Sequence, residues 1–140
     1  MRRDDRGSTV VEFALVMPIV LTLLMAIVQY GYHYWALETA AATAREAARR
    51  LVVGTDPACT VDLARDHAAA PGVGSTAPTV TYAFDSGLAR GQRGDLVTVT
   101  VSFQSLDIGL LPLPGGGVVT ETASNRVENV PEDPLPCAGN

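Results

Sequence analysis

The stretch from Arg6 to Val53 decides the fold. It opens with Arg6-Gly-Ser-Thr-Val-Val-Glu-Phe13 and continues in an apolar run that carries no charge as far as Val28. An aromatic cluster, Tyr30-Gly-Tyr-His-Tyr-Trp35, follows, and an alanine-rich amphipathic pattern then leads to Gly54. Because glycine commonly stands just past a helix end, this succession predicts one long helix. We expect its first half to lie in a membrane and its second half outside.

The apolar half, Val10 to Trp35, is longer than the roughly 20 residues that a helix needs to cross a bilayer. Its aromatic end is typical of the membrane–water interface, and we expect His33 to be an interfacial residue there. Pro18 removes a helical hydrogen bond, which predicts a kink. Arginines close to the start of the span place the N-terminus in the cytoplasm by the positive-inside rule. These arginines are Arg2, Arg3 and Arg6.

The second half of the helix has apolar residues at alternating spacings of four and three, which form a narrow stripe. The stripe consists of Leu37, Ala41, Ala44, Ala48 and Leu51. Alanine permits the close approach of another element, so we expect the stripe to pack on a sheet or on another helix. Charged residues mostly occupy the other faces, where Glu46 and Arg50 make a favourable i,i+4 pair.

The chain after Gly54 predicts a small antiparallel sheet with one short helix. Asp56-Pro57 is a helix-start signal, and the helix is expected to cover residues 57–70. Alternating residues predict strands over 79–84, 95–104 and, more weakly, 118–128, with an apolar excursion over 106–117 between the last two. The valine-rich face of the middle strand needs a cover, and the long helix is the obvious candidate. The fold class is therefore α+β.

Composition and motifs exclude several functions. The formal charge of -5 argues against nucleic acid, which requires clustered positive charge. All ten basic residues are arginine, so Gly115-Gly-Gly117 cannot be a phosphate-binding loop, which needs a lysine, and no cofactor is expected. Neither His33 nor His67 has a nearby carboxylate or nucleophile pattern, and the acidic residues lack metal-ligand spacing. We therefore expect neither catalysis nor a metal site.

The two cysteines, Cys59 and Cys137, lie on the side of the span that we place outside the cytosol. In an oxidising compartment, such a pair more often forms a disulfide than a metal site. Free thiols are the alternative.

Glu12 stands at the mouth of the apolar run, where a carboxylate is costly to insert. One explanation is local, because Thr9 and Glu12 have the spacing of a capping box, in which the glutamate bonds the N-cap amide. The other explanation uses Gly7: if the chain were cut after it, Ser8 would carry a charged amine and Glu12 would be the fifth mature residue. An ammonium from the same or a neighbouring subunit would then neutralise Glu12 and fix the axial register of stacked helices.

The run from Gly7 to Phe13 resembles the class III signal of type IV pilins and pseudopilins, which are cut after Gly with Glu at the fifth mature position. More closely, Arg6–Pro18 and Ala44–Arg49 are similar to TadE-like proteins, and the segments 95–103 and 122–128 resemble that family more loosely. The resemblance implies a minor pilin, a pseudopilin or an assembly component of a Tad (tight adherence, Flp-type) pilus. Its implied partners are other pilin subunits, a prepilin peptidase and an assembly platform.

These observations divide the chain into four parts: a leader (1–7), a membrane-spanning half-helix (8–35), an extracytoplasmic half-helix (36–54) and a small extracytoplasmic domain (55–140). Membrane lipid is the expected surrounding of the second part. The alternative is an ordinary anchored or secreted binding domain, because Ala40-Ala-Ala42 and Ala42-Thr-Ala44 satisfy the small-x-small rule of signal peptidase. A plain anchor does not need Glu12, whereas a pilin-like subunit does. A TadE-like protein that keeps its leader is also compatible with the sequence.

Overall fold

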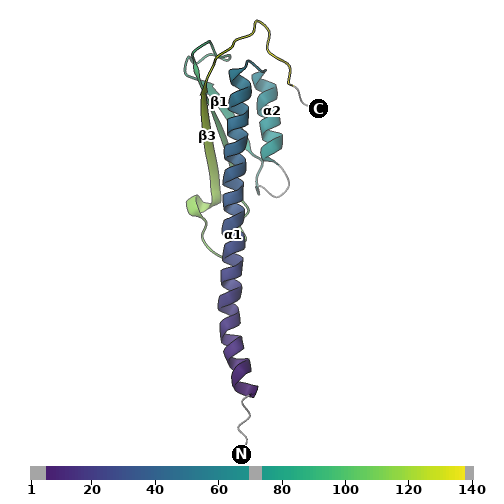
Figure 1. Ribbon diagram of the computed structural model, residues 1–140, viewed down its shortest axis with the longest axis vertical. Helices are drawn as coiled ribbons and strands as arrows, with labels where there is room; N and C mark the ends of the chain where they lie inside the picture. Colours follow the sequence, from purple (N-terminus) through teal and green to yellow (C-terminus); the bar gives the residue numbers. More distant parts are fainter. Residues whose placement is uncertain (1–5, 70–73, 138–140) are drawn as a thin grey trace, which may run out of the picture.

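The computed structural model describes residues 6–69 and 74–137. A single long helix, α1 (Arg6–Val52), runs through the molecule, and all other elements pack along its C-terminal half (Figure 1). The N-terminal half of α1 extends beyond them as a bare stem (Figure 1). The predicted α+β architecture is confirmed.

Helix α1 is continuous through Pro18, and the Thr22 hydroxyl donates a hydrogen bond to the Pro18 carbonyl over 2.7 Å. The helix begins at Arg6, so Thr9 lies inside it and cannot be its N-cap. The capping-box explanation of Glu12 was therefore wrong, because the helix starts one turn earlier than that motif requires.

The C-terminal end of α1 is closed by Gly54, whose φ of 86° is readily adopted only by glycine. Gly54 N donates to Leu51 O over 3.2 Å and Thr55 N donates to Arg50 O over 3.1 Å. These two bonds are the Schellman pattern that satisfies the last carbonyls of a helix. The end predicted from the sequence is confirmed.

The short helix α2 (Pro57–Ala68) begins as predicted and ends two residues before the predicted end. The Asp56 carboxylate caps it by accepting a hydrogen bond from Ala58 N over 3.1 Å. Proline at the first helical position needs no amide partner, which suits the start of a helix. Helix α2 then runs back along α1 (Figure 1).

Three antiparallel strands, β1 (Thr79–Phe84), β2 (Leu96–Gln104) and β3 (Val118–Arg126), form a sheet in the order β1-β2-β3. In the central strand every second residue is buried, as the alternating pattern predicted. Val99 of β2 pairs with Tyr82 on one side and with Ala123 on the other. A short 3₁₀ helix, η1 (Pro114–Gly117), immediately precedes β3.

The core lies between the valine face of the sheet and the alanine face of α1. The stripe predicted for α1 was partly wrong, because Leu37 and Ala41 are only half-buried while the face is broader than a narrow stripe. The sheet and α2 both pack on this half of α1 and together cover more of its circumference. The buried apolar residues of α1 are Ala36, Ala40, Ala44, Ala47, Ala48 and Leu51.

Candidate functional site

The N-terminal half of α1 is an exposed apolar surface. Phe13, Leu15 and Ile27 each expose about two thirds of their surface, and the large apolar residues between them are also exposed except for Met17, which is half-buried. An 18-residue window of this helix has a mean hydropathy of 2.5, and none of it is buried by the rest of the chain. So large an unpartnered apolar surface requires a lipid or protein cover. The helix is long and apolar enough to cross a membrane.

Gly7, Ser8 and Glu12 all lie in the first turns of α1. Glu12 follows Ser8 by four residues, which is about one turn of an α-helix. Glu12 is exposed. The ion pairs between described residues are Glu46–Arg50 and Asp62–Arg65, and Glu12 takes part in neither.

Gln29 joins the end of the apolar half of α1 to the loop after β2. Its side chain is only 2% exposed. Its Nε2 donates hydrogen bonds to Asp107 Oδ1 over 2.9 Å and to Leu111 O over 2.8 Å, and its Oε1 accepts one from Leu111 N over 3.3 Å. This amide therefore uses both its donor and its acceptor sides on one loop, which fixes the loop against the helix.

Two further side chains of α1 bind the same region. The Tyr30 hydroxyl donates to Pro112 O over 2.9 Å. His33 Nδ1 lies 2.9 Å from Ser105 Oγ, which also donates to Gly117 O over 3.0 Å. With that serine proton used on Gly117, the Nδ1–H tautomer of His33 satisfies both groups.

The His33 side chain is only 3% exposed, because the chain itself covers it. We name this set of contacts the junction clamp: Gln29, Tyr30 and His33 on α1 with Ser105, Asp107, Leu111 and Pro112 on the loop. One feature of the sequence could have predicted the junction clamp: Gln29 is a polar residue in a mostly apolar run. A buried amide needs hydrogen-bond partners, so such a residue indicates a contact with another part of the chain.

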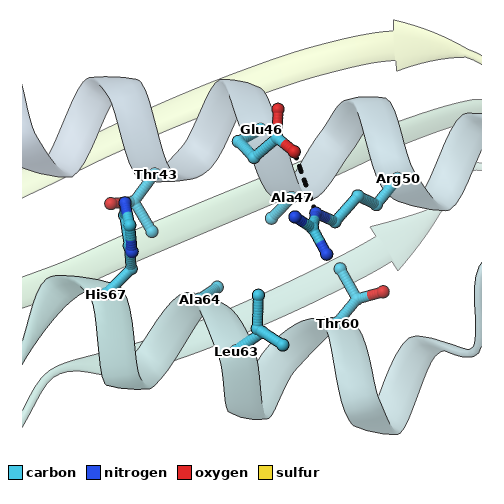
Figure 2. Close-up of a pocket in the computed structure, with 8 residues that line it drawn as sticks. All are labelled: Thr43, Glu46, Ala47, Arg50, Thr60, Leu63, Ala64 and His67. Carbon is cyan, nitrogen blue, oxygen red and sulfur yellow. Dashed lines mark hydrogen bonds and ion pairs between the residues drawn. The ribbon is translucent and has the colours of Figure 1, made fainter. Parts of the chain in front are cut away.

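A cleft of about 240 Å³ lies between α1 and α2 (Figure 2). In Figure 2, Ala47 and Ala64 lie along its centre, while His67 and Thr43 stand at one end and Arg50 at the other. The Glu46–Arg50 pair on its edge, 2.9 Å apart, is an i,i+4 pair on a helix surface, which stabilises the helix modestly.

Cys59 in α2 and Cys137 in the C-terminal segment form a disulfide, with their Cα atoms 6.2 Å apart. The same segment is also held by the backbone, because Asp56 N donates to Leu135 O over 3.1 Å and Leu135 N donates to Gly54 O over 3.0 Å. The C-terminal segment is therefore tied to the point where α1 ends and α2 begins. Within residues 6–69 and 74–137, no group of three or more His, Cys, Asp or Glu side chains could hold a metal ion.

Comparison with known proteins gives a match over the long helix. Residues 7–49 match the family model described as TadE-like protein. No curated protein and no solved structure shows significant similarity to the chain. The matched residues coincide with almost all of α1, which includes Gly7, Ser8, Glu12 and the helical side of the junction clamp. The resemblance predicted from the sequence is thus confirmed for the long N-terminal helix, which is similar to TadE-like proteins over residues 7–49.

Proposed function

We propose that this chain is a minor pilin-like subunit or assembly component of a Tad pilus. The observation that carries the proposal is the TadE-like match over residues 7–49, the helix whose N-terminal half is bare and apolar. Such a helix can lie in a membrane and can later pack against the helices of other subunits, because both surroundings cover apolar surface. The role is structural, not catalytic.

In this proposal the N-terminus is cytoplasmic, residues 8–35 span the membrane, and residues 36–54 continue the helix outside it. Residues 55–140 are the extracytoplasmic domain. Arg2, Arg3 and Arg6 before the span support this orientation. The Cys59–Cys137 disulfide supports it too, since disulfides persist in oxidising compartments.

The proposal gives Glu12 the role of a register residue. A prepilin peptidase cuts after Gly7, and the new amine of Ser8 then lies one helical turn from Glu12. Among the described residues, Glu12 belongs to no capping box and to no ion pair. Its carboxylate can therefore bind the Ser8 amine. In an apolar packing of helices, an ammonium from the same or a neighbouring subunit stabilises that carboxylate and fixes the axial position of the subunit.

The test is Glu12→Gln, with Glu38→Gln as the matched control. Both glutamates are exposed on α1, but only Glu12 lies in the apolar half. We expect both variants to reach the membrane at the level of the unaltered protein. Pili, counted by electron microscopy and by shearing, are lost in Glu12→Gln and kept in Glu38→Gln. Normal piliation by Glu12→Gln would refute the register role.

A further inference from the structure

The loop from Leu106 to Leu111 presents apolar side chains to the outside of the domain. Leu106, Ile108 and Leu110 are 43%, 51% and 45% exposed. Asp107 and Gly109, which alternate with these three residues, are exposed as well. Exposed leucine and isoleucine at alternate positions of one loop form a local apolar patch, and such a patch requires a partner.

The junction clamp fixes where this patch lies along α1. Gln29 and Tyr30 bind Leu111 and Pro112, and these two helix residues stand where the exposed apolar half of α1 ends. Figure 1 shows that this loop descends beside α1, below the sheet, as the part of the domain nearest to the bare stem. The patch is therefore continuous with the apolar surface of the stem.

Several polar groups of the loop have partners within the protein. The Asp107 carboxylate accepts hydrogen bonds from Gln29 Nε2 and from Gly109 N, the latter over 2.7 Å. The carbonyls of Leu111 and Pro112 accept from Gln29 and Tyr30. Asp107 is the only ionisable residue between Ser105 and Gly117. Irregular backbone in the hydrocarbon region needs protein partners for its polar groups, and these bonds supply such partners for part of the loop.

We propose that Leu106, Ile108 and Leu110 insert into the outer leaflet of the lipid bilayer beside α1 and seat the extracytoplasmic domain on the membrane surface. This inference rests on the membrane-spanning part of the proposed function. The exposed rings of Tyr34 and Trp35, one turn beyond Tyr30, lie at the headgroup level in this placement, where aromatic rings are favoured. The occupant of the patch is lipid, and the loop sets the depth of the domain before any assembly.

The test uses single-tryptophan variants of the full chain in vesicles of phosphatidylethanolamine and phosphatidylglycerol, with and without brominated acyl chains, which quench tryptophan on contact. Trp35→Phe removes the only native tryptophan. In that background, Ile108→Trp reports on the loop, and Leu21→Trp reports on the span. Leu88→Trp is the matched control, because Leu88 is as exposed as Ile108 but lies in the loop at the opposite end of the sheet.

We expect brominated lipid to quench Leu21→Trp and Ile108→Trp, the latter most strongly when the bromines lie near the headgroups, and to leave Leu88→Trp unchanged. Aqueous acrylamide quenches Leu88→Trp more than Ile108→Trp. If brominated lipid quenched Leu21→Trp but not Ile108→Trp, the inference about the loop would be overturned, while the membrane span would stand. An Ile108→Trp shielded from both quenchers would also overturn it, because a second protein copy would then cover the loop. No quenching of Leu21→Trp would refute the span and the inference together.

Discussion

The side-chain amide of Gln29 donates a hydrogen bond to the carboxylate of Asp107 over 2.9 Å, although the two residues lie 78 positions apart in the chain. This bond connects the last part of the apolar stem to the domain that follows it. Higher on the helix, α1 and the sheet meet through an apolar core that contains alanine, valine, leucine and phenylalanine side chains. The clamp therefore adds polar contacts between the stem and the domain at the level where the stem becomes bare.

Replacement of Gln29 by leucine is expected to destabilise the domain by about 1–3 kcal/mol, because Asp107 and both backbone groups of Leu111 lose a buried partner. Thermal unfolding in detergent micelles measures the loss. Gln29→Glu keeps the shape of the side chain but places a second carboxylate against Asp107. Its loss of stability at neutral pH is therefore larger than that of Gln29→Leu. Equal stability of Gln29→Leu and the unaltered protein would show that the Gln29 contacts contribute nothing to stability.

Gly54→Ala is expected to destabilise the protein by more than about 1 kcal/mol, since it combines a positive φ with a steric clash. A Cβ at this position would overlap the ring of Pro131. Gly87→Ala is the matched control, because Gly87 has a φ of 72° and nothing within 4 Å of its added Cβ. Chemical denaturation of both variants separates the backbone cost from the clash. If Gly87→Ala lost as much stability as Gly54→Ala, the clash with Pro131 would contribute nothing to the cost.

Removal of the disulfide by the double change Cys59→Ser and Cys137→Ser is expected to lower the free energy of unfolding by about 2–5 kcal/mol, because the bond closes a long loop. Limited proteolysis then cuts the C-terminal segment first, since without the disulfide it is held only by non-covalent contacts such as those at Pro131 and Leu135. A reducing agent lowers the melting temperature of the unaltered protein but not that of the variant. If the unaltered protein and the double variant had the same melting temperature without reductant, the disulfide would not stabilise the fold.

Asp95 is expected to contribute to the acid sensitivity of the fold. The backbone amide of Gln92, and then the Ser86 hydroxyl, donate to its carboxylate and lower the pKa of Asp95 from its ordinary value of 3.8. Its stabilising effect is therefore fully present above pH 3.8 and is lost as the pH falls through the lowered folded-state pKa. Asp95→Asn lacks this pH dependence, and Ser86→Ala retains part of it. Parallel acid-unfolding curves for Asp95→Asn and the unaltered protein would contradict this.

The sequence predicted the elements well, because their signals are local. The alternation along Val97, Val99, Val101 and Phe103 predicted the buried face of β2, and each of these residues is buried. Strand β1 has its predicted bounds, and Gly54 marks the end of α1 as expected. A Gly, a Pro or a period of two acts within a few residues, so no knowledge of the fold was needed.

The orientation of α1 and the junction clamp could not be predicted in the same way. Ala40, Ala41 and Ala42 are identical in chemistry, so the sequence cannot tell which of them faces the sheet, and only Ala40 is buried. The partners of Gln29 and His33 lie more than seventy residues away, in a loop with no regular period. Long-range hydrogen bonds of this kind depend on the tertiary arrangement and not on local pattern.

The most direct test of the central claim is the intact mass and N-terminal sequence of the protein extracted from its native membrane. The proposed pilin-like role predicts a chain that begins at Ser8, because prepilin processing removes residues 1–7 and frees the amine that Glu12 requires. A chain that begins at Thr43 or Arg45 would reveal an ordinary signal peptide and contradict the pilus role. A chain that still begins at Met1 would contradict the processing and the register role of Glu12.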